Sequence, residues 1–200
     1  SSLVHMFEEV RREFGSAESR FYGMIDATGA WSLDEAGLHA ALQSAMEAAQ
    51  PVMLLGTAFS YVHLVDQLAP DGKSFHLPPG SRALETGGYK GRSRSLPKSD
   101  LHQLIGERLG LAAEQIVCEY GMSELSSQAY DVRLSQSEEA STPARCFQFP
   151  PWARVRVVSP ETGREVQDGE TGLVRVVDLA NLWSVAAVQT DFQGIVDRHG

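Results

Sequence analysis

Short apolar runs alternate with helical patterns through the first part of the chain. Residues 52–55 form an apolar run, helical periodicity follows over 58–68, and residues 82–86 again have the character of a strand. A further helical face at 101–109, with Pro97 near its first turn and Gly110 beyond its end, leads to a second apolar run at 115–119. Strands joined by helices in this way form parallel sheets through right-handed crossovers. The pattern therefore predicts an α/β fold in which helices flank a parallel sheet.

Two more helices are expected before this region. Apolar residues recur at helical spacing near the start, at Leu3, Phe7, Val10 and Phe14, and a short strand is expected over 21–26. The next helix is expected to begin at Ser32, because Glu35 completes a capping-box pattern, and to end at Pro51. The run at 52–55 is uniformly apolar, which indicates a strand buried on both faces, with Gly56 turning the chain into the following helix.

The pattern changes towards the end of the chain. Residues 154–158, 172–177 and 185–190 are rich in β-formers, and turn residues separate them. These segments predict a small, mostly antiparallel β subdomain. We expect an α/β subdomain over 1–142 and the β subdomain over 143–200, with residues 133–144 as a polar connector.

Composition excludes several classes of function. The 17 basic and 26 acidic residues give a net charge of −9, which argues against nucleic acid as a general partner. No apolar run approaches the roughly 18 residues of a membrane span. Cys118 and Cys146 are too few for a disulfide framework and lack metal-ligand spacing, so a reducing, cytoplasmic setting is expected.

Three separated motifs carry the functional interpretation. TGGYKG occupies 86–91 at the end of an expected strand, EYGMSEL occupies 119–125 after the next one, and QTD occupies 189–191. The middle motif offers an aromatic ring, a hydroxyl and a carboxylate on one turn. These groups can stack on a base, donate to a phosphate oxygen and hold Mg²⁺ through oxygen. The motifs therefore indicate nucleotide chemistry.

The three motifs, in this order, resemble those of the adenylate-forming enzyme superfamily. ETGGYKGR followed by EYGMSELSSQ is most similar to the acyl-protein synthetases of bacterial luminescence systems (LuxE type) and to their phenylacetate-CoA-ligase-like relatives. The resemblance implies a ligase that uses ATP and Mg²⁺ to convert a carboxylic or fatty acid to acyl-AMP. It also implies an acyl-acceptor thiol, either a protein cysteine or coenzyme A.

The resemblance also implies roles for individual residues. Gly87, Gly88 and Tyr89 are expected to line the adenine pocket, with Tyr120 stacking on the base beside Gly121. Ser123 is expected to donate to the α-phosphate and Glu124 to hold Mg²⁺, while Asp191 accepts both ribose hydroxyls. The phosphate loop and the lysine-bearing C-terminal domain of the superfamily are not found here. The chain is therefore expected to be the central part of a larger ligase that holds AMP without turnover.

Simpler interpretations stand beside these. The paired glycines also suit a plain turn, Tyr120 a half-buried aromatic and Glu124 a solvated turn residue. An aryl-CoA ligase or a noncatalytic nucleotide-binding module would show the same motifs. A serine hydrolase is rejected, because its nucleophile elbow needs glycine where this chain has Leu125.

The helix start after the first apolar run offers a substrate pocket. Thr57, Phe59 and His63 lie there and can line an acyl pocket, although core packing explains Phe59 equally well. Cys118 is expected to be an inert buried thiol rather than the acyl-carrying group.

Overall fold

The chain forms two compact units, Ser1–Cys118 and Glu119–Gly200. The structure, a computed structural model, describes residues 2–25, 27, 29–70, 72–89, 91, 93–133 and 145–196. The sequence predicts a subdomain boundary between 142 and 143, which falls inside the second unit. Both positions lie outside the described residues. That boundary stays a prediction.

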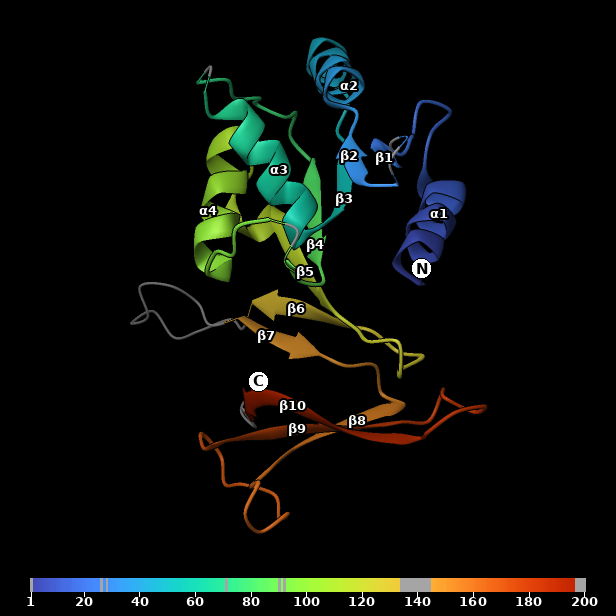
Figure 1. Ribbon diagram of the computed structural model, residues 1–200, viewed down its shortest axis with the longest axis vertical. Helices are drawn as coiled ribbons and strands as arrows, with labels where there is room; N and C mark the ends of the chain where they lie inside the picture. The colour runs from blue at the N-terminus through green and yellow to red at the C-terminus, as the bar shows by residue number, and fades with distance from the viewer. Residues whose placement is uncertain are drawn as a thin grey trace. The chain divides into compact units, whose positions relative to one another are not determined.

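The first unit has the predicted alternation of strands and helices (Figure 1). β3 (Met53–Thr57) and β4 (Arg82–Thr86) pair in parallel, and α3 (Ala58–Leu68) connects them. α4 (Lys98–Leu109) and a single 3₁₀ turn at Ala113–Gln115 lead to β5 (Ile116–Tyr120), which passes from the first unit into the second. The α/β fold with a mostly parallel central sheet is therefore confirmed.

The core of the first unit is built on α3 and α4, which lie side by side (Figure 1). Leu68, Ile105 and Leu109 are completely buried there. Each such side chain contributes about 1.5–3 kcal/mol through removal of apolar surface from water. The helices are therefore held mainly by the apolar stripe that the sequence shows.

A buried tyrosine links the two parallel strands. The hydroxyl of Tyr61 lies 2.9 Å from the carbonyl oxygen of Leu54 and 3.3 Å from that of Leu84. Gly56 leaves room for this ring, because a Cβ there would lie 2.9 Å from it. The expectation that Gly56 turns the chain was wrong: it lies inside β3 and admits the ring of Tyr61.

Helix ends follow the expected capping chemistry. Thr57 caps α3, where its hydroxyl accepts a hydrogen bond from the backbone N–H of Ser60 at 3.3 Å. Pro97 directly precedes α4, and Gly110 ends it in the left-handed conformation, with φ of 67°. Glycine adopts that conformation without the penalty a Cβ would bring. The predicted bounds of both helices are confirmed.

The start of the second helix was predicted wrongly. α1 (Ser2–Phe14) ends where expected, but Ser32 lies in β2 (Trp31–Leu33), which pairs antiparallel with β1 (Gly23–Ile25). α2 (Glu35–Glu47) begins after Asp34, whose carboxylate accepts from the N–H of Gly37 at 2.9 Å. A carboxylate cap two residues further on, together with the hairpin pairing of Ser32, moved the start of the helix.

The burial of β3 also differs from the expectation. It is the first strand in the sheet order and Met53 is 54% exposed, so this strand is not buried on both faces. An apolar run alone does not distinguish an edge strand from a central one, because the sheet order depends on pairing between distant segments.

The second unit is antiparallel, as predicted. The end of β5 pairs with β6 (Ala129–Arg133), and β6 pairs with β7 (Arg145–Gln148). β8 (Ala153–Val158), β9 (Thr171–Asp178) and β10 (Ala187–Ile195) form a three-stranded antiparallel sheet. The sequence did not predict β6, and the expected connector lies outside the described residues from position 134 onward.

Neither Cys118 nor Cys146 forms a disulfide among the described residues. Cys118 is buried in the first unit, as the sequence predicts, and Cys146 is half-buried in β7 of the second. Within the described ranges, no helix is long and apolar enough to cross a membrane.

Candidate functional site

The middle motif forms an exposed turn directly after β5. Tyr120 is the last residue of the strand, and the backbone N–H of Leu125 closes the turn by donating to the carbonyl oxygen of Met122 at 3.1 Å. The hydroxyl of Ser123 donates to Oε2 of Glu124 at 3.3 Å, and both side chains are exposed. The turn therefore presents a hydroxyl and a carboxylate together to solvent.

Gly121 is required by its neighbour in the same motif. A Cβ at this position would lie 2.3 Å from Oε1 of Glu119, whose side chain is only 4% exposed. A larger residue at this position would require the buried carboxylate of Glu119 to move. The glycine therefore lets the Glu119 carboxylate lie against the backbone of the turn.

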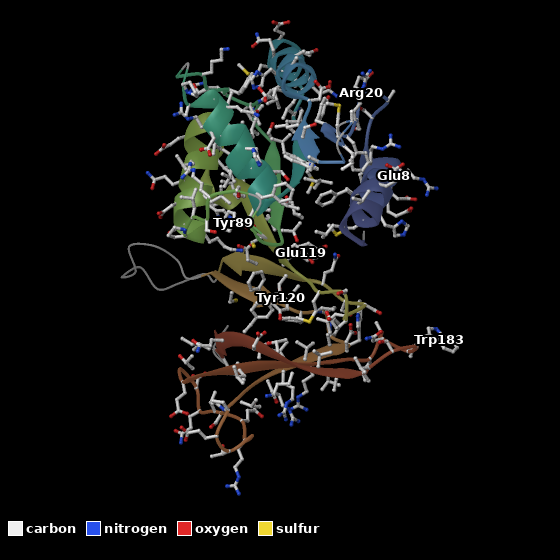
Figure 2. All side chains as sticks on the ribbon, in the orientation of Figure 1. Glu8, Arg20, Tyr89, Glu119, Tyr120 and Trp183 are labelled. Atoms are coloured by element: carbon white, nitrogen blue, oxygen red, sulfur yellow. The ribbon has the colours of Figure 1, made fainter. Side chains whose placement is uncertain are left out.

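Tyr120, labelled in Figure 2, has three phenylalanine rings around it. The ring centroids of Phe147, Phe149 and Phe192 lie 5.6, 5.7 and 6.1 Å from that of Tyr120, with planes tilted by 52°, 63° and 76°. Burial raises the pKa of Tyr120, and the nearby Thr190 hydroxyl opposes this only in part. Edge-to-face contacts of this kind favour a fixed ring orientation. The ring is thus held in place by the second unit itself.

Sequence reasoning missed these phenylalanines. Phe147 and Phe149 are two residues apart, which places them on the same face of an extended segment. That spacing was the available signal, but it has no meaning until β7 is known to lie beside β6.

Asp191 lies in an irregular part of β10. Pairing with β9 is regular up to Gln189 and resumes at Gln193 in a shifted register. The Thr190 hydroxyl stabilises this irregularity by donating to the carbonyl oxygen of Val174 at 2.9 Å and accepting from the N–H of Phe192 at 3.2 Å. Bulges redirect side chains. Asp191 is exposed as a result.

Glu124 and Asp191 line the same open groove, which has a volume of about 650 Å³. Its remaining lining is Met122 from the motif turn, Leu173 from β9, and Val188, Gln189, Thr190 and Phe192 from β10. The second unit therefore brings together two of the three motifs that the sequence singled out.

The groove fits a magnesium ion that is bound largely through a nucleotide. No group of three or more His, Cys, Asp or Glu side chains in the described part of the chain is arranged to hold a metal. Mg²⁺ usually takes one or two carboxylates together with substrate phosphates and water, not an all-protein cage. The exposed Glu124 carboxylate, with oxygen donors only, meets that requirement.

The paired glycines and Tyr89 belong to the first unit. Gly87 follows β4 with φ of 65°, a backbone conformation that residues with a Cβ rarely adopt. At Gly88 an added Cβ would have no atom within 4 Å. Tyr89 packs on the core and donates its hydroxyl to the carbonyl oxygen of Leu96 at 2.9 Å. These contacts hold the loop, and the expected role of all three residues at adenine stays a prediction.

The residues expected to line an acyl pocket have structural contacts in the first unit. Thr57 caps α3, and the ring of Phe59, which is 7% exposed, lies 4.8 Å from that of Trp31. The His63 ring lies 5.3 Å from the same tryptophan. Packing accounts for Phe59, and an acyl-binding role for these residues remains a prediction.

A buried polar cluster in the first unit was not anticipated. Oε2 of Glu85, 1% exposed, lies 3.2 Å from Nζ of Lys98, 3.3 Å from Nε2 of His102 and 3.2 Å from Sγ of Cys118. Burial raises the pKa of Glu85, but His102 and Lys98 outweigh burial and lower it. Burial first, and then the charge of Glu85, raise the pKa of Cys118 to about 12. The thiol is thus kept protonated, which suits an inert residue.

Comparison with known sequences relates the chain to one family. The family model described as "Acyl-protein synthetase, LuxE" matches residues 12–200. The long-chain-fatty-acid–luciferin-component ligase of Aliivibrio fischeri is 28% identical over 149 residues. That alignment covers 72% of this chain and 36% of the relative, so the chain spans about a third of that protein's length.

Solved structures have a similar fold. The adenylation domain of a keto acid-selecting NRPS module, bound to a keto acyl adenylate, has a TM-score of 0.50 at 14% identity. The alignment covers 82% of this chain and 36% of the chain of that structure. ATP-bound MatB from Rhodopseudomonas palustris has a TM-score of 0.44 at 18% identity, with coverage of 69% and 24%. At 14% identity, the likeness to the adenylation domain concerns the fold alone.

Proposed function

Because this chain belongs to the LuxE family of acyl-protein synthetases, we propose that it is part of an ATP-dependent ligase that activates a carboxylic acid as acyl-AMP and passes the acyl group to a thiol. The observation that carries the proposal is the shared groove of Glu124 and Asp191 next to the turn after Tyr120. Two carboxylates that line one groove, with the ring of Tyr120 packed on the lining residue Phe192, suit the phosphate, ribose and base of one nucleotide.

The first step needs no general base. A carboxylic acid with a pKa of about 4 is ionised at neutral pH, so its oxygen can attack the α-phosphorus directly. An O–P bond forms, the bond from the α-phosphorus to its bridging oxygen breaks, and pyrophosphate leaves with that oxygen. The work of the protein is therefore positioning and charge stabilisation.

Each candidate residue of the second unit has a role in this proposed reaction. The Ser123 hydroxyl, now directed at Glu124, rotates to donate to an α-phosphate oxygen. Asp191 accepts hydrogen bonds from the ribose hydroxyls, and the Tyr120 ring stacks on adenine. Glu124 holds Mg²⁺, which supplies neutralisation of the phosphate charges when bound. In the second step the thiol sulfur attacks the acyl carbon and AMP leaves.

We propose a fatty acid as the substrate class. The name of the Aliivibrio fischeri relative specifies a long-chain fatty acid, and the groove has apolar side chains at Met122, Leu173 and Val188. The acceptor is a protein cysteine, with coenzyme A as the alternative. We propose a reducing, cytoplasmic setting, with which two cysteines outside any disulfide among the described residues are compatible.

Turnover belongs to the longer protein in this proposal. Since the chain spans about a third of its relative, we propose that it supplies the nucleotide groove and binds AMP weakly by itself. Aryl specificity would appear as preference for a phenylacetyl adenylate analogue over a dodecanoyl one. A noncatalytic module would bind nucleotide but neither analogue more tightly than AMP.

Calorimetric or NMR titration of AMP and of ATP with Mg²⁺ tests the proposal. Asp191→Asn should weaken both ligands about ten- to a hundredfold, because the loss of a charged hydrogen-bond acceptor costs about 1.5–3 kcal/mol. Glu124→Gln should weaken only ATP with Mg²⁺. The matched control is Glu161→Gln, an exposed glutamate outside the groove. If Asp191→Asn and Glu124→Gln both bind AMP and ATP with Mg²⁺ as tightly as the wild-type chain does, the proposal is refuted.

A further inference from the structure

The side chain of Asp178 is completely buried at the end of β9. Oδ2 accepts hydrogen bonds from the backbone N–H groups of Ser126 at 2.9 Å and Ser127 at 2.8 Å. Oδ1 accepts from the Ser127 hydroxyl at 2.8 Å and from the N–H of Ala180 at 3.0 Å. Most of these donors therefore belong to the segment that directly follows Glu124, more than fifty residues away in the sequence.

The neighbouring Asn181 holds the same segment from a second point. Its Nδ2 donates to the carbonyl oxygen of Glu124 at 2.7 Å and to that of Val185 at 2.8 Å. Its Oδ1 accepts from the Ser126 hydroxyl at 3.2 Å. The backbone from Glu124 to Ser127 is thus tied to the connection between β9 and β10, residues 179–186.

The chemistry of the position requires a carboxylate. An ionised carboxylate only accepts hydrogen bonds, and all four of its contacts are donors. Burial raises the pKa of Asp178, but the hydroxyl of Ser127 and the backbone N–H groups of Ser127, Ala180 and Ser126 outweigh it and lower the pKa. An asparagine would turn an NH₂ group against at least one of these donors.

We propose that Asp178, with Asn181, is a positioning residue that holds the Glu124 turn against the connection leading into β10. Asp178 and Asn181 together tie the segment that follows Glu124 to the connection that leads into β10. This inference rests on the proposed function, because its consequence is the alignment of Glu124 with the nucleotide phosphates.

The consequence is selective for the phosphates. Loosening the turn displaces Glu124 and Ser123, whereas Asp191 keeps its own place in β10 through Thr190. ATP with Mg²⁺ should therefore lose affinity, and adenosine should not. A residue that merely stabilises the unit would affect both ligands alike.

The test is NMR titration of this chain with ATP plus Mg²⁺ and with adenosine. Asp178→Asn and Asn181→Ala should each weaken ATP with Mg²⁺ about tenfold and leave adenosine within about twofold. In a Glu124→Gln background each substitution should have a much smaller effect, because of the two groups that it positions only Ser123 remains. Leu182→Ala, in the same connection and 77% exposed, is the matched control and should bind both ligands as wild type does.

Asn181→Ala keeps the test decisive if Asp178→Asn does not fold, since Asn181 lies nearer the surface. Trp152 reports the network independently of nucleotide, because its Nε1 donates to the Ser127 hydroxyl at 2.9 Å. With Trp31 and Trp183 replaced by Phe, its emission should shift in Asp178→Asn.

The outcomes separate two failures. If Glu124→Gln weakens ATP with Mg²⁺ but Asp178→Asn and Asn181→Ala do not, or if their effects add in full to that of Glu124→Gln, the positioning role is wrong and the proposed function stands. If the wild-type chain binds ATP no more tightly with Mg²⁺ than without it, the proposed function fails and the positioning role fails with it.

Discussion

The Tyr120 and Phe192 rings lie 6.1 Å apart with their planes at 76°. Tyr120 ends β5, and Phe192 directly follows Asp191 in β10. This contact joins the two strands that carry the candidate groups, so the orientation of the tyrosine and the position of the aspartate depend on each other.

We predict that the ring of Tyr120, and not its hydroxyl, binds adenine. Tyr120→Leu should weaken AMP about tenfold or more, since stacking of one base on an aromatic side chain is worth about 1–3 kcal/mol. Tyr120→Phe should bind within about twofold of wild type. Calorimetry of the two variants checks this, and equal affinity of Tyr120→Leu and wild type would show that the base lies elsewhere.

Glu85 should stabilise the first unit in a pH-dependent way. Its folded pKa is lowered, so its contribution is present above the unfolded value of about 4.3 and is lost as the pH falls through the lower folded value. Glu85→Gln should lower the free energy of unfolding by about 1–3 kcal/mol at pH 7, because Lys98 and His102 lose their charged partner.

Urea unfolding of Glu85→Gln and wild type across pH 3–7 measures this effect. The difference between the two proteins should shrink as the pH falls below about 4.3. The exposed Glu161→Gln is the control and should track wild type throughout. A difference that stays constant with pH would mean that the Glu85 charge contributes nothing.

Cys118 should resist alkylation in the folded protein. With a pKa of about 12 instead of the ordinary 9.0, its thiolate population at pH 8 is about a thousandfold smaller, and the side chain is only 1% exposed. Iodoacetamide labelling followed by mass spectrometry should modify Cys118 only in urea. Modification of Cys118 in native Cys146→Ala at the rate of a free thiol would contradict the buried cluster.

Local signals predicted the helices well and the strand partners poorly. The bounds of α3 and α4 were right because Thr57, Pro97 and Gly110 act on the nearest backbone groups. The predicted helix start at Ser32 was wrong because Asp34 caps α2 instead, and because the backbone of Ser32 pairs with β1 in the hairpin. Capping preferences alone do not rank two adjacent candidates.

The sequence predicted candidate residues one by one, but not the surface that they form. The motifs singled out Glu124 and Asp191, whose roles stay predictions, and the groove that both residues line depends on the irregular pairing of β10, which the sequence does not reveal. The sequence did not predict roles for Phe147, Phe149 and Asp178, because each of these residues contacts a segment that is distant in the sequence. For Glu85 the sequence predicted only a place in the strand 82–86. Its partners Lys98, His102 and Cys118 lie in α4 and β5, so the cluster depends on how these elements pack.

The most direct test of the account is to replace Mg²⁺ by Mn²⁺ and record paramagnetic broadening of the backbone amide signals in the presence of ATP. We expect the strongest broadening at residues 121–125 and at Asp191, and we expect it to be lost in Glu124→Gln. Broadening centred on other residues, or unchanged in Glu124→Gln, would contradict the claim that Glu124 and Asp191 share one nucleotide site.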